Sequence, residues 1–140
     1  MSLSNMSPEF QSIFDALRKI LQKHRGSWSV QEDSGTCYSL AGGVGPAVLR
    51  AWHGKLKRPT MPIAWVQVGK AYVSYHLMAV YGNAQLLDGM SRALKARMQG
   101  KTCFNFKSID KALFTELDDL TARAIASFKK AGYVCEPKAA

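Results

Sequence analysis

Apolar residues follow the spacing of an amphipathic helix near both ends of the chain. In the N-terminal segment the apolar positions are Phe10, Ile13, Phe14, Leu17, Ile20 and Leu21, a spacing that predicts one buried stripe. Ser7 and Pro8 are typical of a helix start, because serine caps the first turn and proline suits the first helical position. A second stripe predicts a long helix over residues 110–131, with inward positions Leu113, Leu117, Leu120, Ala124 and Phe128.

Two segments in the middle of the chain alternate between apolar and polar residues, which is typical of strands. They cover residues 63–68 and 71–78 and predict a hairpin whose two-residue loop, Gly69 and Lys70, pairs Val68 with Ala71. The period of two predicts a core face of Ala64, Val66, Val68, Val73, Tyr75 and Leu77. It predicts an opposite face of Ile63, Trp65, Gln67, Tyr72, Ser74 and His76.

The remaining pattern predicts short strands and one more helix. We expect strands over 28–32, 36–40 and 102–106, and a helix over 84–98 that is capped by Asn83 and buries Leu86, Leu87, Met90, Leu94 and Met98. The glycine-rich segment 41–46 is expected to be a flexible connection, and 48–60 an irregular basic excursion. The prediction is an α+β fold: an antiparallel sheet of about five strands with helices packed on one face, including N-terminal and C-terminal helices.

The length favours one domain over residues 1–140, with 1–6 expected to be disordered or vector-derived. The net charge is +9, and all of the excess lies in 50–107, which holds ten basic residues against one acid, Asp88. Such a concentration attracts anions, although a solvated basic face is an equal alternative.

Cys37, Cys103 and Cys135 are an odd number with no close pair, which favours free thiols in a reducing compartment. No apolar run approaches the ~20 residues of a membrane span. We therefore expect a cytoplasmic protein without a membrane partner, and no motif indicates a cofactor.

The second half of the chain contains stretches that are similar to a known family. The most specific is Gly100-Lys101-Thr102-Cys103-Phe104-Asn105-Phe106-Lys107, preceded by Val73-Ser74-Tyr75-His76-Leu77-Met78 and followed by Leu113-Phe114-Thr115-Glu116-Leu117. On these residues the chain resembles the YdhG-like family of uncharacterised domains. The resemblance implies an α+β fold with an antiparallel sheet, in a group often described as frataxin-like. A few relatives are described as iron chaperones.

Two alternatives from other functional classes follow. Iron binding would use clustered carboxylates such as Glu116, Asp118 and Asp119. A cysteine-dependent enzyme would use Cys103, with its thiol pKa lowered by nearby lysines and with His76 as a base if their strands are adjacent. No complete catalytic set or metal site is visible, and we expect the protein not to be an enzyme.

The strongest candidate is a binding surface on the opposite face of the sheet. Its predicted ligand-binding residues are Trp65, Tyr72, His76, Arg92, Lys95, Lys101 and Lys107. Aromatic platforms bordered by cations suit anionic or planar ligands, including nucleotides or single-stranded nucleic acid, although no RNA-binding motif is present. A partner protein, a homodimer through this face, or coverage by 48–60 are the alternatives.

Overall fold

A computed structural model describes residues 7–51, 60–100 and 102–136. The expectation for residues 1–6 lies outside this described part. In chain order the elements are α1 (Pro8–Lys23), β1 (Ser29–Asp33), β2 (Cys37–Val44), α2 (Pro46–Ala51), β3 (Thr60–Val68), β4 (Val73–His76), the 3-10 helices η2 (Met78–Gly82) and η3 (Ala84–Gly89), α3 (Arg92–Lys95), β5 (Met98–Gln99), β6 (Cys103–Phe106), α4 (Lys111–Lys130) and β7 (Val134–Cys135).

The strands form one antiparallel sheet in the order β1-β2-β3-β4-β6-β5, and β7 pairs with the end of β2. The predicted α+β class is thereby confirmed. Seven strands are present in the described ranges, against about five expected. The two strands that the sequence did not indicate, β5 and β7, have two residues each, which is too short to show alternation.

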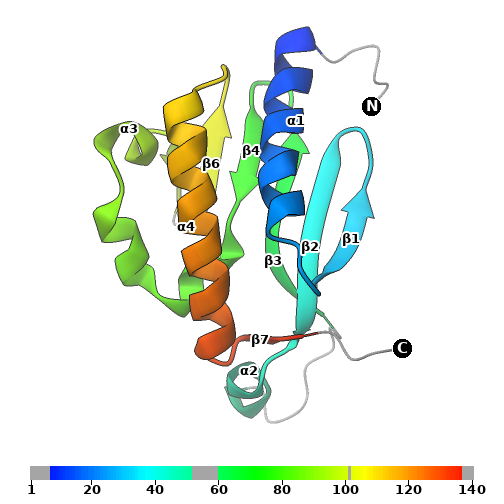
Figure 1. Cartoon of the computed structure of the whole chain (residues 1–140), viewed down its shortest axis with the longest axis vertical. Coiled ribbons are helices and arrows are strands. Elements are labelled where there is room, and N and C mark those ends of the chain that lie inside the picture. The colour runs from blue at the N-terminus through cyan, green and yellow to red at the C-terminus, as the bar shows by residue number, and fades with distance from the viewer. Residues whose placement is uncertain (1–6, 52–59, 101, 137–140) are drawn as a thin grey trace.

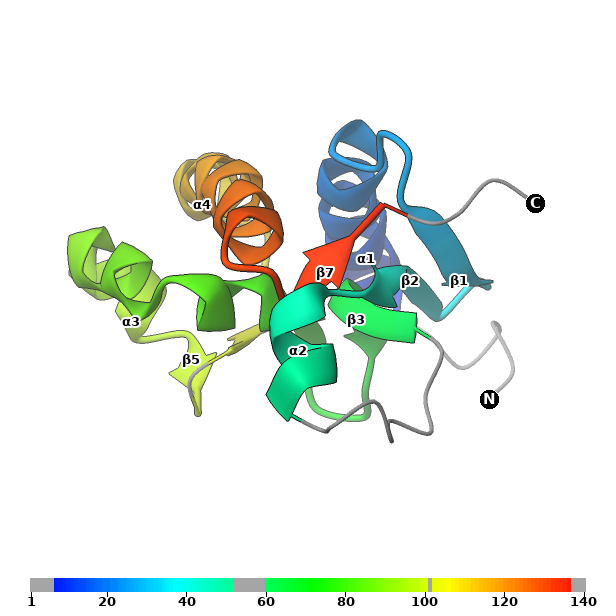
Figure 2. The ribbon, with the colours of Figure 1, turned by 90° about the horizontal axis from the view of Figure 1, so that it is seen from below.

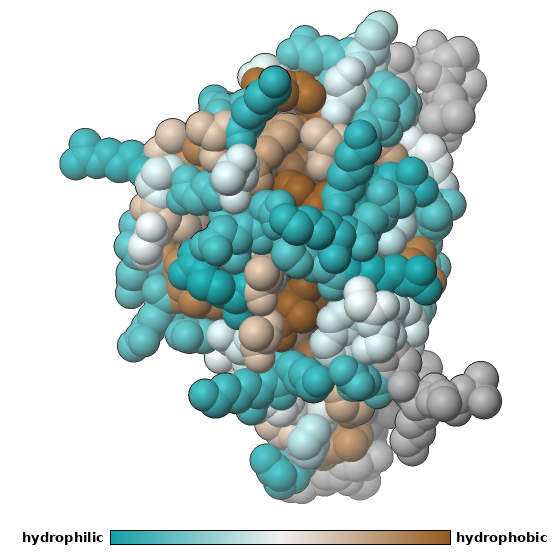
Figure 3. All heavy atoms as spheres, viewed as in Figure 1, coloured by the Kyte–Doolittle hydropathy of each residue, from teal (hydrophilic) through white to brown (hydrophobic). Residues whose placement is uncertain are grey.

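Helices α1 and α4 pack on one face of the sheet (Figures 1 and 2). The predicted cap at Ser7 forms, because its side chain accepts a hydrogen bond from Phe10 N. Asp110 caps α4 in the same way by accepting a hydrogen bond from Leu113 N, which the sequence had not indicated. The apolar stripes of both helices supply much of the core, together with Tyr75, Phe104 and their neighbours in the sheet. Polar side chains dominate the outer surface of this helical layer, and apolar residues show only in small areas (Figure 3).

The β3–β4 hairpin has the predicted faces but a different register. Val68 pairs with Val73, so the loop has four residues instead of two, and Gly69 N donates to Tyr72 O. A shift of two residues leaves every side chain on its face, and the six predicted core positions are all buried. Ile63 is the exception: it is fully buried, although the sequence placed it on the opposite face.

A β-bulge explains the burial of Ile63. Leu40 pairs with Ala64, whereas the next residue, Ala41, pairs with Pro62. Ile63 is therefore an extra residue in β3, and the bulge turns both Ile63 and Ala64 toward the core.

The glycine-rich segment 41–46 is not a flexible connection. Gly42 and Gly43 lie within β2, and Pro46 begins α2. A Cβ atom on Gly42 would lie 2.6 Å from Val134 Cγ2 and 2.8 Å from Trp28 Cε3. Close packing therefore requires glycine here. Part of the expected irregular excursion, 48–51, is helical, and β3 begins at Thr60; residues 52–59 lie outside the described part.

The predicted helix over 84–98 is wrong. The segment forms η3, α3 and β5 instead, because Ser91 caps a new helix by accepting from Leu94 N, two residues after Gly89. Asn83 does cap η3, through Gln85 N. Of the expected apolar stripe only Leu94 is fully buried.

Among the residues that the structure describes, no helix has both the length and the apolar character of a membrane span.

Candidate functional site

The face of the sheet opposite α1 and α4 carries two rows of mostly polar side chains, and we call it the open face. Strand register sets the first row as Glu32, Ser39, Trp65, His76, Cys103 and Gln99. It sets the second row as Cys37, Gln67, Ser74 and Asn105. The residues between these positions, such as Val66, Tyr75 and Phe104, are buried beneath the helices, so strand alternation directs both rows outward.

Trp65 and His76 stack at the centre of the open face. Their ring centroids lie 4.6 Å apart with an interplanar angle of 14°. Burial lowers the pKa of His76, so its imidazole is neutral at pH 7 and stacks as an uncharged ring. One face of the Trp65 indole is therefore occupied and held in place.

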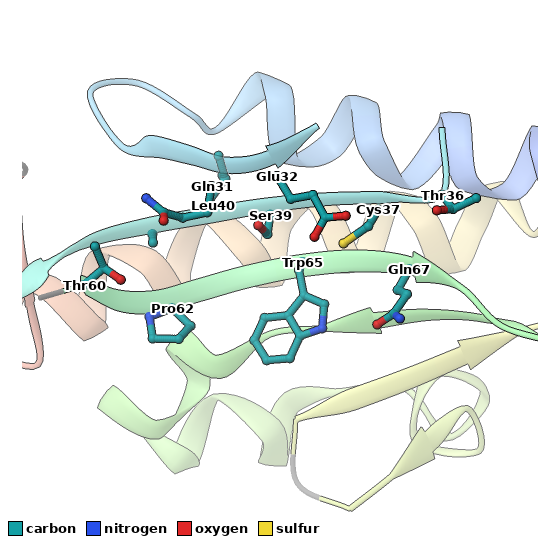
Figure 4. A pocket seen from close by; sticks show the side chains of 11 residues that line it. Gln31, Glu32, Thr36, Cys37, Ser39, Leu40, Thr60, Pro62, Trp65 and Gln67 are labelled. Carbon is teal, nitrogen blue, oxygen red and sulfur yellow. The ribbon is translucent and has the colours of Figure 1, made fainter. Parts of the chain in front are cut away.

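A first hollow of about 380 Å³ borders Trp65 on the side of β1 and β2 (Figure 4). Its lining consists of Gln31, Glu32, Thr36, Cys37, Ser39, Leu40, Ala41, Thr60, Pro62, Trp65 and Gln67. His76 lies on β4, so the indole face turned away from it borders this hollow. Glu32 is the one charged residue in this lining. The hollow thus combines an aromatic wall with several hydrogen-bonding groups and a single carboxylate.

A second hollow of about 310 Å³ lies toward the β5 edge of the same sheet. Its lining consists of Tyr72, Ala96, Arg97, Met98, Gln99, Asn105 and Lys107. Arg97 and Lys107 are exposed, and this lining contains no carboxylate. The two hollows therefore differ in charge: the first contains an acid and the second contains two bases.

A hydrogen-bond network centred on Asn105 borders the second hollow and extends to Cys103. Asn105 Oδ1 accepts from Ser74 Oγ at 2.9 Å and from Cys103 Sγ at 3.3 Å. Asn105 Nδ2 donates to Gln99 Oε1 at 2.8 Å, and Tyr72 OH reaches the same oxygen at 3.4 Å. These bonds connect β4, β5 and β6 and hold the polar side chains in fixed positions.

The predicted adjacency of Cys103 and His76 is confirmed. The two residues are cross-strand neighbours, and Cys103 Sγ lies 3.9 Å from His76 Nε2. The expected lowering of the thiol pKa is not found. Burial raises the pKa of Cys103, more than a hydrogen bond with Ser74 lowers it. Burial likewise raises the pKa of Cys37, to about 11, with a further contribution from Glu32. Both thiols are protonated at neutral pH and are weak nucleophiles.

The predicted binding residues fall into three groups. Trp65, Tyr72 and His76 do share the open face, and Lys107 lines the second hollow. Arg92 and Lys95 are exposed on α3 and line neither hollow. Lys101 lies outside the described residues.

Several residues of the candidate site were not predicted from the sequence. Glu32, Gln99 and Asn105 reach the site only because β1 and β5 occupy the sheet edges and β6 pairs with β4. Arg97 falls within the expected helix over 84–98, which does not form, and it instead precedes β5. The alternation of Cys103 and Asn105 around the buried Phe104 was the one available signal.

The carboxylates considered for iron already have partners. Asp118 pairs with Lys23 and His24, Asp119 pairs with Arg123, and Glu116 accepts hydrogen bonds from the backbone and side chain of Ser91. Partial burial raises the pKa of Asp118, but hydrogen bonds from His24 and Lys23 outweigh it and lower the pKa. No group of three or more His, Cys, Asp or Glu residues in the described part of the chain could hold a metal ion.

Comparison of the chain with protein-family models, with curated proteins and with solved structures finds no match. The resemblance to the YdhG-like family consequently stays a prediction that rests on the residues that suggested it.

Proposed function

We propose that the protein is a non-enzymatic binding domain whose open face holds a planar, polar ligand against Trp65. The observation that carries this proposal is the position of the indole ring. One of its faces is stacked on His76, and the other borders a hollow of about 380 Å³. This volume falls within the range of small-molecule sites, roughly 300–1,000 Å³.

The lining of the first hollow supports a planar ligand with polar edges. An aromatic ring that is already fixed on one side loses little freedom when a second ring stacks on its other side. Thr36, Ser39 and Gln67 supply hydrogen-bonding groups to the lining of the same hollow. A stacked ligand would satisfy these groups along its edge, whereas a purely apolar ligand would leave them without water or partner.

The charge of the chain supports an anionic group elsewhere on the same ligand. The net charge is +9, and Arg97 and Lys107 lie at the second hollow of the open face. Arg92 and Lys95 on α3 would add only a longer-range attraction, because they line neither hollow. The three free cysteines are in keeping with the cytoplasmic location that we propose.

The test uses planar probes and a matched aromatic control. Adenosine, cytidine and riboflavin are titrated by calorimetry into the wild type, Trp65→Ala and Tyr81→Ala. Tyr81 is 51% exposed and lies on η2, outside both hollows. We expect at least one probe to bind, with affinity reduced about tenfold or more by Trp65→Ala and unchanged by Tyr81→Ala. Failure of all three probes, or equal affinity in a folded Trp65→Ala variant, would contradict the proposal.

A partner protein or a second copy of the chain is the alternative occupant of this face. Native mass spectrometry of the gently purified protein separates these cases. A retained small molecule supports the ligand proposal. A stable dimer that Trp65→Ala dissociates would instead assign the face to self-association.

The contact between Cys103 and His76 favours one further candidate, a cysteine-dependent enzyme. This candidate ranks lower because burial raises the thiol pKa. It requires Cys103 to be alkylated faster than Cys135, which is exposed, at neutral pH. We expect the opposite order, measured by mass spectrometry of iodoacetamide-treated protein.

A further inference from the structure

The two hollows of the open face carry opposite charge, and this difference constrains the ligand further. Glu32 lies in the first hollow, on the β1 side of Trp65. Arg97 and Lys107 lie in the second, toward β5. An anionic group placed beside Glu32 would be repelled, whereas the second hollow offers two cations and no carboxylate in its lining.

From these positions we infer that the open face binds a nucleotide-type ligand, with its ring on Trp65 beside Glu32 and its phosphates at Arg97 and Lys107. This inference rests on the proposed function, because the ring subsite is the Trp65 hollow. The phosphate subsite is a separate site of the same surface. It adds a ligand class and an orientation that stacking alone does not give.

The spacing of the hollows fits this class. Trp65 on β3 and Gln99 on β5 belong to one cross-strand row, with His76 and Cys103 between them. Three interstrand steps of about 4.8 Å separate the Trp65 and Gln99 backbones by about 14 Å. Arg97 precedes β5 and Lys107 follows β6, so both cations lie beyond the Gln99–Cys103 pair and reach this row through their long side chains. Such a distance suits the extended phosphates of a nucleoside triphosphate, or the backbone of a short single strand. A ligand of this length would lie over His76 and Cys103.

The second hollow contains donors suited to phosphate oxygens. Arg97 can present two parallel N–H groups and Lys107 a mobile ammonium, both from exposed positions. Gln99 uses its Oε1 atom to accept from Asn105 and Tyr72. Its Nε2 atom, at the other end of the same amide, is a further neutral donor.

Glu32 gives the ring subsite a preference for rings whose edge carries an N–H donor. Its side chain points to the same side of the sheet as Trp65 (Figure 4). A carboxylate accepts hydrogen bonds only, so the ring edge beside it must donate. Amino-substituted bases such as adenine and cytosine meet this requirement. Purine riboside lacks the amino group, and we expect it to bind more weakly than adenosine in the wild type and equally well in Glu32→Ala, which removes the acceptor.

The main experiment separates the ring subsite from the phosphate subsite. Adenosine and ATP, with cytidine and CTP as a second pair, are titrated by calorimetry at one fixed salt concentration. The variants are Arg97→Gln/Lys107→Gln, Trp65→Ala, and the control Lys19→Gln/Lys111→Gln. The control removes the same charge from exposed positions on α1 and α4.

We expect ATP or CTP to bind about tenfold or more tightly than its nucleoside in the wild type. Arg97→Gln/Lys107→Gln should reduce this ratio to near one, while the control variant keeps it. Trp65→Ala should weaken nucleoside and triphosphate by the same factor. A ratio that survives Arg97→Gln/Lys107→Gln, or that the control lowers equally, overturns the phosphate subsite.

Two further ligands, pyrophosphate and a trinucleotide, test the phosphate subsite separately and identify the kind of ligand. If no nucleoside binds, the proposed ring site fails, and pyrophosphate alone then tests the phosphate subsite. Binding of pyrophosphate that Arg97→Gln/Lys107→Gln abolishes supports the subsite, and no binding by the wild type overturns it. The trinucleotide pApApA identifies the source of the ligand. Tighter binding than ATP indicates a single strand, and equal or weaker binding indicates a free nucleotide.

Discussion

The two faces of β3, β4 and β6 both carry aromatic and hydrogen-bonding side chains, but these side chains differ in their burial and in their partners. On the helix-covered face Tyr75 is fully buried, and its hydroxyl contacts Thr121 Oγ1 at 2.6 Å, which in turn donates to Leu117 O. On the open face, one side of the Trp65 ring stacks on His76. Every hydrogen-bonding group of the first cluster is satisfied within the fold, whereas the second cluster is fixed in place and still borders a hollow.

This difference separates the residues that stabilise the fold from those that we propose bind a ligand. A buried aromatic residue with a satisfied hydroxyl contributes to the free energy of unfolding. A half-buried aromatic residue beside a hollow contributes less to the fold and is available to a ligand. Substitutions on alternate residues of one strand should therefore separate the two effects.

The largest effect is expected at the buried position of β6. Phe104→Ala removes a fully buried ring, and we expect the free energy of unfolding to fall by about 3–5 kcal/mol. The neighbouring substitution Asn105→Ala alters the open face, where water can reach the remaining groups, and should cost about 1 kcal/mol. Urea unfolding of both variants measures the contrast. Equal losses would contradict the assignment of the two faces.

An intermediate effect is expected from the buried hydroxyl pair. Thr121→Val keeps the shape of the side chain but leaves Tyr75 OH without its partner. The free energy of unfolding should fall by about 1–3 kcal/mol, the cost of an unsatisfied buried donor. Ser74→Ala, which removes a half-buried hydroxyl from the open face, is the comparison and should cost less. A larger loss of unfolding free energy for Ser74→Ala than for Thr121→Val would contradict this contrast between the two faces.

The smallest effect is a pH dependence at His76. Burial lowers its pKa in the folded protein, where it lies between Trp65 and Cys103. The unfolded chain therefore takes up the proton first as the pH falls below about 6.5. His76 should lower the stability as the pH falls from 7 toward 5, and His76→Gln should reduce this slope. An NMR titration that places the His76 pKa above 6.5 would contradict the sign.

The sequence predicted the fold where the pattern was long. The stripes of α1 and α4 extend over several turns, and their caps, Ser7 and Asp110, lie at the helix starts. The faces of the hairpin were also right, because a register error of two residues preserves alternation. The helix predicted over 84–98 does not form, because Gly89 and Ser91 divide one apolar stripe into separate short elements.

The site was predictable only in part, for a topological reason. Alternation alone placed Trp65 and His76 together on one face. Which strands lie beside them depends on strand order, and the pairing of β4 with β6 brings Cys103 and Asn105 to the same surface. The edge strands supply Glu32, on the predicted strand β1, and Gln99, on β5, whose two residues are too few to show alternation.

The central claim, that the open face binds a planar ligand at Trp65, is tested most directly by NMR. The indole N–H signal of Trp65 is assigned by its loss in Trp65→Phe and followed while adenosine is added. Trp28 is buried in the core and serves as the internal reference. We predict that the Trp65 signal shifts and saturates while the Trp28 signal stays in place. A Trp65 signal that does not move, or that moves together with Trp28, would contradict the claim.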